Sequence, residues 1–160
     1  MGIDPGTIAL GWGAIDSNGH DSQIVEFGVV RTTSKAPLHL RLLTIFEELQ
    51  DIIERIRPDA MAVEEVFLGK NPRSALWIGH ARAVAMLAAA KMQISLAEYA
   101  AREIKMAVVG NGSASKKQVE YMVGTILHTA DRIPQDAADA LAVALCHSSR
   151  CTDFYLTHNQ

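Results

Sequence analysis

The chain has 160 residues, 49% of them hydrophobic, and a formal net charge of −3. This length predicts one domain that buries about two thirds of its unfolded surface without disulfide support. The longest apolar stretch, Ala83 to Ala90, is far shorter than the ~20 residues of a membrane span. The two cysteines match neither a disulfide nor a zinc framework, and no secretory signal is recognisable. We therefore expect a reduced, cytoplasmic location and no membrane contact.

The hydrophobic pattern predicts three strands followed by alternating helices and strands. Asn18-Gly19 is a hairpin signal, and Pro58 ends the first long amphipathic helix. In chain order we expect strands at 2–4, 9–15 and 24–31, a helix at 37–57, a strand at 60–67, a helix at 71–92, a strand at 94–99, and helices at 101–109, 116–127 and 135–147. This order indicates an α/β fold with a mixed central sheet flanked by helices. Residues 1–150 should form a single domain, and residues 151–160 a polar, frayed tail.

Four acidic residues fall where such a fold would bring them to one point. Asp4 ends the first strand in Gly-Ile-Asp-Pro-Gly, and Glu64 ends the apolar run 60–63. Asp136 and Asp139 are three residues apart and so share one face of the last helix. Carboxylate oxygens suit Mg²⁺ or Mn²⁺, and two such ions about 4 Å apart can hold the attacking and leaving oxygens of a phosphodiester. The residues alone therefore predict a metal-dependent nuclease.

Some of these acids also admit a purely structural role. Asp4 before Pro-Gly can cap a turn, and Asp136 can complement a helix dipole. Glu64 follows a buried run, where an unpaired charge is costly, so a ligand role is favoured. The negative net charge argues against a nucleic-acid partner. Two bound divalent cations would change that charge from −3 to +1, so we expect DNA affinity to depend on metal.

Five motifs, in this order along the chain, resemble the RuvC family of Holliday-junction resolvases. They are GIDPG at 2–6, AVEEVF at 62–67, KNPRSAL at 70–76, EIKMAVVGNGSASKKQV at 103–119 and DAADALAVAL at 136–145. The resemblance implies a ribonuclease-H-like fold and a homodimer. It also implies an endonuclease that resolves four-way DNA junctions by symmetric paired nicks in recombination and repair, leaving 5′-phosphate and 3′-hydroxyl ends. Two Mg²⁺ per active site, replaceable by Mn²⁺, and a RuvA–RuvB branch-migration complex as a partner belong to the same expectation.

The resemblance also implies roles for individual residues. The family's metal ligands fall on Asp4, Glu64, Asp136 and Asp139. The family pattern selects Glu64 over Glu65, which strand alternation turns the other way. The expected DNA contacts are Phe67, Lys70, Arg73, Lys105, Lys116 and Lys117. Lys116 would offset charge at the scissile phosphate, and Phe67 would stack on opened bases.

Ordinary structural roles remain open for several of these residues. Phe67 can be a core aromatic, and the lysines can be solvated charges, although the glycine-rich segment 110–115 favours phosphate contact. His147 can line the metal site or simply pack. The small residues of the helix at 71–92 suit either the family's dimer contact or packing on the sheet.

Two other functions remain open at this point. One is a different ribonuclease-H-like nuclease that acts on RNA or on branched DNA in general. The other is a non-catalytic junction binder or an actin-like phosphate-binding module, for which 160 residues leave little room. Family members carry several apolar residues before GIDPG, but only Met1 precedes it here. We therefore expect a short first strand and marginal stability.

Overall fold

The computed structural model describes residues 1–18, 21–66, 72–129 and 132–158. Its five strands are β1 (Gly2–Asp4), β2 (Ala9–Ser17), β3 (Ser22–Arg31), β4 (Ala60–Glu64) and β5 (Ser95–Tyr99). They form one sheet in the order β3-β2-β1-β4-β5. The β1–β2 and β2–β3 pairs are antiparallel, whereas β1–β4 and β4–β5 are parallel. The predicted mixed sheet is confirmed, with its shortest strand at the centre.

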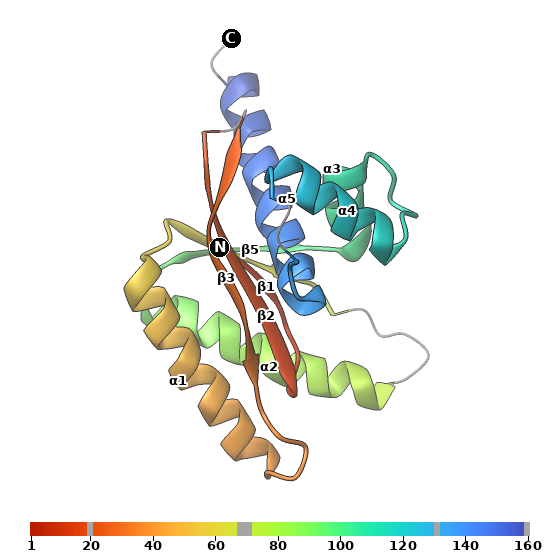
Figure 1. Ribbon diagram of the computed structural model, residues 1–160. Coiled ribbons are helices and arrows are strands. Elements are labelled where there is room, and N and C mark those ends of the chain that lie inside the picture. Colours follow the sequence, from red (N-terminus) through yellow and green to blue (C-terminus); the bar gives the residue numbers. More distant parts are fainter. Residues whose placement is uncertain (19–20, 67–71, 130–131, 159–160) are drawn as a thin grey trace.

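Helices cover both faces of this sheet (Figure 1). They are α1 (Leu38–Ile56), α2 (Pro72–Lys91), α3 (Ala101–Val109), α4 (Lys116–Ile126) and α5 (Gln135–His158). α1 and α2 pack on one face, and α3, α4 and α5 pack on the other. The elements agree with the predicted ones except at some ends. β4 ends at Glu64, three residues before the predicted end.

The predicted end of the last helix, at residue 147, is wrong. α5 continues without a break to His158. The segment 148–158 contains no glycine or proline that would end a helix. Polar composition alone suggested a tail, but polar residues are compatible with a helix that projects beyond its neighbours, as the end of α5 does in Figure 1.

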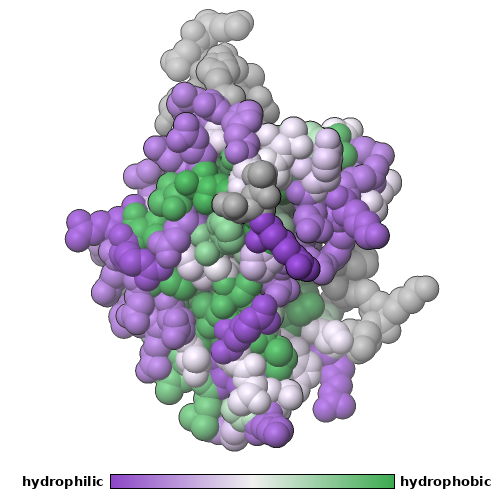
Figure 2. Space-filling view, in the orientation of Figure 1, coloured by the Kyte–Doolittle hydropathy of each residue, from purple (hydrophilic) through white to green (hydrophobic). Residues whose placement is uncertain are grey.

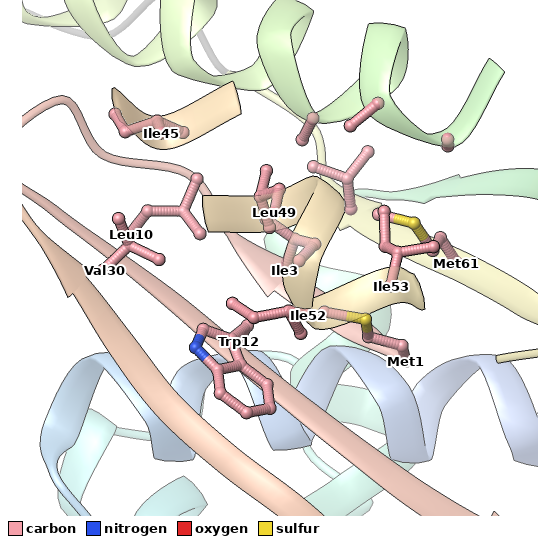
Figure 3. Close-up of a cluster of buried hydrophobic side chains, with 14 of the residues drawn as sticks. Met1, Ile3, Leu10, Trp12, Val30, Ile45, Leu49, Ile52, Ile53 and Met61 are labelled. Atoms are coloured by element: carbon pink, nitrogen blue, oxygen red, sulfur yellow. The ribbon is translucent and has the colours of Figure 1, made fainter. Parts of the chain in front are cut away.

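One hydrophobic core lies between the sheet and the helices α1 and α2. Strand alternation turns every second side chain to this face, and α1 contributes apolar residues at helical spacing. Figure 3 shows this cluster, which includes Ile3, Leu10, Trp12, Val30, Ile45, Leu49, Ile52, Ile53 and Met61. Ile3 and Val63 belong to it and are fully buried. Their strand neighbours Asp4 and Glu64 consequently face the opposite side, toward α5.

On that opposite face, glycines let the backbone of α5 lie directly on β1 and β2. A Cβ atom at Gly2 would overlap the carbonyl oxygen of Ala140, and one at Gly11 would overlap that of Asp136. A glycine inside a strand commonly marks such a close backbone approach. α5 also presents a run of fully buried small residues to the sheet, including Ala137. This close packing brings the acidic first turns of α5 up to the end of β1.

The surface is an ordinary mixture of polar and apolar groups. Figure 2 shows hydrophobic areas separated by hydrophilic side chains on the face toward the viewer. Apolar atoms cover much of any folded protein, so scattered exposed hydrophobic residues need no special explanation. Within residues 1–18, 21–66, 72–129 and 132–158, none of the helices combines the length and apolar character needed to cross a bilayer.

Candidate active site

The centre of the candidate site is the shared end of two parallel strands. β1 and β4 pair with Gly2 opposite Ala62 and Ile3 opposite Val63. Asp4 is the last residue of β1 and Glu64 the last residue of β4. Because parallel strands bring their carboxyl ends to the same edge, these two carboxylates end side by side. A turn follows Asp4 at that edge and leads into the antiparallel strand β2.

Helices on the same face complete the site. A cavity of about 160 Å³ is lined by Asp4, Glu64, Asp139 of α5, Lys105 of α3 and Lys116 of α4. A second cavity of about 570 Å³ shares Asp4 and Glu64 in its lining. The two strand-end carboxylates can therefore be reached from two adjoining spaces.

The carboxylates disfavour one another's charge. The pKa of Asp4 is raised to about 7, first by burial and then by the neighbouring charges of Asp139, Glu64 and, more weakly, Asp136, while Lys116 opposes them. The pKa of Glu64 is also raised, first by burial and then by Asp139. Partial burial of several like charges is costly unless a cation offsets them. The cluster therefore favours a bound cation.

One lysine already offsets part of that charge. Lys116 Nζ lies 2.9 Å from Asp139 Oδ2, with 69% of the lysine side chain and 20% of the aspartate side chain exposed. The pKa of Lys116 is raised, chiefly by its hydrogen bond to Asp139. Ser115 caps α4 at the preceding position: its hydroxyl accepts a hydrogen bond from the Gln118 amide, and the Gln118 side chain accepts one from the Ser115 amide. This capping box fixes the backbone that carries Lys116.

The donor set fits divalent metal, although its carboxylates are not gathered as ligands. Within the described part of the chain, no three histidine, cysteine, aspartate or glutamate side chains are close enough together to hold a metal ion. Asp139 is instead bonded to Lys116. All the candidate donors are carboxylate oxygens, which suit Mg²⁺ or Mn²⁺. A divalent cation would also relieve the repulsion that raises the pKa of Asp4.

The other residues predicted from sequence lie at varying distances from this cavity. Asp136 is half-buried in the first turn of α5 and outside the lining of the cavity, but its charge acts on Asp4. Arg73 is exposed near the start of α2, and Lys117 is exposed and lines a separate groove on α4. Phe67 and Lys70 lie outside the described residues.

His147 has a structural role away from the acids. Its Nδ1 lies 2.8 Å from the Tyr99 hydroxyl, and its Nε2 lies 3.6 Å from Cys151 Sγ. It lines a different cavity, beside Met1 and the β2–β3 hairpin. Of the two roles that the sequence left open, packing is therefore the one that the structure supports.

The loop that follows Asp4 is held by a buried arginine that the sequence did not predict. Arg41 of α1 is 6% exposed, and its Nε donates a 3.0 Å hydrogen bond to the Thr7 carbonyl. Its guanidinium also bonds the Thr7 hydroxyl, and Thr32 Oγ1 donates to the same carbonyl at 2.6 Å. The available signal was an arginine on the apolar face of an amphipathic helix, four residues before Ile45.

Comparisons with known proteins agree with this architecture. A family model described as crossover junction endodeoxyribonuclease RuvC matches residues 1–147. A crossover junction endodeoxyribonuclease RuvC from Magnetococcus marinus is 48% identical over 147 residues, which cover 92% of this chain and 82% of the relative. Its counterpart from Desulforamulus reducens is 46% identical over 155 residues, covering 96% of this chain and 95% of the relative.

Solved structures give the same result. The structure of T. thermophilus RuvC in complex with Holliday junction substrate has a TM-score of 0.90 at 32% identity, covering 96% of this chain and 94% of that one. The yeast mitochondrial Holliday junction resolvase has a TM-score of 0.62 at 10% identity, over 98% of this chain and 82% of that one, which is a likeness of fold. The expected ribonuclease-H-like fold and resolvase function are confirmed, and the chain belongs to the RuvC family of crossover junction endodeoxyribonucleases.

Proposed function

We propose that Asp4, Glu64, Asp136 and Asp139 hold the divalent cations with which this chain cuts two opposing strands of a four-way DNA junction. The family consists of metal-dependent nucleases. The observation that carries the assignment is the meeting of Asp4, Glu64 and Asp139, from three separate elements, with two lysines around one cavity. A group of repelling carboxylates has no structural advantage by itself. It gains one when cations bind, which supports a metal site at this place.

Two Mg²⁺ ions, or Mn²⁺ in their place, would supply Lewis acidity and an activated water at neutral pH. The chain's own residues have distinct tasks around them. Asp4 and Glu64 at the strand ends, together with Asp136 and Asp139 on α5, would hold the cations. Lys105 and Lys116 offset the negative charge of the phosphodiester that enters the cavity. The nicks carry 5′-phosphate and 3′-hydroxyl ends.

The DNA path follows from the positive groups near the acids. Lys105 and Lys116 contact the phosphate at the cavity, and Arg73 and Lys117 contact the backbone further away. Lys70 is a further expected backbone contact. Phosphate contacts of this kind fix the register of DNA on a protein. The 570 Å³ cavity beside Asp4 and Glu64 offers room next to the cleaved strand. Phe67, three residues after Glu64 in the sequence, stacks on opened bases.

Symmetric cutting leads to a homodimer. A four-way junction offers two equivalent strands, and two active sites related by a twofold axis reach both of them. Exposed leucines on α2, Leu76 and Leu87, each 62% exposed, are suited to such a contact. A RuvA–RuvB branch-migration complex is the partner expected at the junction, and the cytoplasm is the expected location.

The test is cleavage of a synthetic four-way junction beside a linear duplex of the same sequence, in Mg²⁺ and in chelator. We expect paired, ligatable nicks on the junction alone, lost in chelator and in Asp4→Asn. Asp51→Asn, which changes an exposed acid of α1, serves as the matched control and should cut normally. Equal cutting of the linear duplex, or cutting by Asp4→Asn, would contradict the proposal.

A further inference from the structure

The ion pair between Lys116 and Asp139 places a cation on one of the proposed metal ligands. Lys116 Nζ and Asp139 Oδ2 are 2.9 Å apart. In the described ranges, this is the only ion pair that involves any of the four acids. An ammonium group and a divalent cation beside the same carboxylate repel each other and compete for its negative charge. The contact with Lys116 therefore weakens metal binding at Asp139, and bound metal favours a shift of Lys116 away from it.

The side chain of Lys116 can move away from Asp139. Its side chain is 69% exposed, so the charge can move into solvent or onto another anion at little cost. The backbone beneath it stays in place, since Ser115 and Gln118 form the capping box of α4. A phosphodiester that enters the cavity supplies the alternative anion, because Lys116 lines that cavity directly. A lysine binds phosphate as a point charge and needs no fixed geometry to do so.

From these contacts we infer that Lys116 is an internal counter-ion, which competes with divalent metal for Asp139 until a DNA phosphate draws it away. The inference rests on the proposed function and adds regulation to it. DNA binding frees Asp139 and so raises metal affinity. By reciprocity, metal binding frees Lys116 for the phosphate and raises DNA affinity by the same factor. The free protein would then hold metal weakly and complete its site only on its substrate.

The chain offers a closely matched control in the adjacent residue. Lys117 carries the same charge on the same turn of α4 but lines a separate groove with Tyr121. Lys117→Met and Lys116→Met therefore change the net charge equally, but only Lys116→Met removes a charge from the cavity and the contact with Asp139. Lys116→Arg retains a positive charge that can pair with Asp139.

The first experiment measures Mn²⁺ binding to the DNA-free protein by isothermal titration calorimetry at pH 8. This pH lies above the pKa of Asp4, which is about 7, so that Asp4 is ionised. We expect Lys116→Met to bind Mn²⁺ about three- to fivefold more tightly than the wild type, the upper part of the range expected for releasing one partly exposed ion pair. Lys117→Met and Lys116→Arg should stay within about twofold of the wild type on the same scale.

The second experiment measures coupling with a four-way junction. Ca²⁺ affinity is determined with and without junction on ice, and gels of the same samples verify that the DNA stays intact. We expect the junction to tighten Ca²⁺ binding to the wild type and to have a much smaller effect on Lys116→Met. Circular dichroism of the three variants verifies folding.

The outcomes separate this inference from the proposed function. Unchanged or weaker Mn²⁺ binding by Lys116→Met, or the same change in Lys117→Met, would overturn the counter-ion role and leave the nuclease assignment intact. An absence of Mn²⁺ binding in every chain at millimolar concentration would overturn the metal site and the inference together. Tighter binding in Lys116→Met alone, with reduced junction coupling, supports it.

Discussion

Replacing Asp4 by asparagine should abolish cleavage and, without metal, make the protein more stable at alkaline pH. The folded state raises the pKa of Asp4 from 3.8 to about 7, mainly through burial and then through the charges of Asp139 and Glu64. A raised carboxyl pKa means that the folded protein binds the proton more tightly than the unfolded chain does. Protonated Asp4 therefore contributes to the free energy of unfolding at low pH. This contribution is lost as the pH rises from about 4 to about 7, and it stays lost above that range.

The size of the effect follows from the pKa values. A change from 3.8 to about 7 corresponds to about 4 kcal/mol at 1.36 kcal/mol per pH unit. Asp4 is half-buried, not enclosed, so water and ions screen much of this energy, and we expect about 1–2 kcal/mol in practice. For a chain of this length, that corresponds to an increase in Tm of about 2–8 °C at pH 8. Near pH 4 Asp4 is neutral in the folded state and only partly ionised in the unfolded chain, so the difference should become small.

The assay is thermal unfolding in chelator at pH 4, 6 and 8, followed by circular dichroism. Asp51→Asn removes an exposed carboxylate from α1 and should leave Tm unchanged throughout. Adding Mn²⁺ at pH 8 should reverse the order, because only the wild type keeps its full ligand set; an ion at 100 times its Kd stabilises by about 2.7 kcal/mol. A Tm for Asp4→Asn at or below that of the wild type at pH 8 in chelator would refute the reasoning about Asp4.

Further outcomes concern the supports of the site. Gly11→Ala should lower the free energy of unfolding by about 1–3 kcal/mol in urea titrations, because its Cβ would overlap a carbonyl oxygen of α5. The control Gly79→Ala has no atom within 4 Å of the added Cβ, so it should be neutral or stabilise the protein by up to about 1 kcal/mol. Lys105→Met should weaken junction binding equally for all sequences and reduce the slope of log K against log salt by about 0.9; an unchanged slope would argue against phosphate contact. Arg41→Met removes the hydrogen bonds to the Thr7 loop and should lower kcat about tenfold with junction affinity unchanged. A normal kcat would show that the loop keeps its conformation without Arg41.

Local sequence patterns were enough to predict most of the secondary structure. Apolar spacing identified α1, and the short strand around Asp4 lies between residues 2 and 4 as predicted. The exception, the helical continuation of α5 to His158, depends on helix propagation from a well-packed preceding segment and not on local polarity. The identity of the four acids came from their motifs, each of which is contiguous in the chain.

Contacts between distant residues could not be predicted in the same way. Lys116 and Asp139 are 23 positions apart, and Arg41 and Thr7 are 34 apart. Their pairing depends on which helices pack on which face of the sheet, and no local pattern encodes that distance. Similarly, Gly2 and Gly11 are unfavourable strand residues when judged from the local sequence. Only the close approach of α5 explains why glycine stands at these positions.

Taken by itself, the sequence determined which residues are chemically able to bind metal and phosphate, and which segments form strands and helices, because both follow from residue type and short-range spacing. Tertiary structure decided their protonation and pairing. Burial beside Asp139 and Glu64 raises the pKa of Asp4, and the approach of α4 to α5 gives Asp139 a lysine partner. Electrostatic energies depend on distance and solvent exposure in three dimensions, and these exist only after the helices have packed on the sheet.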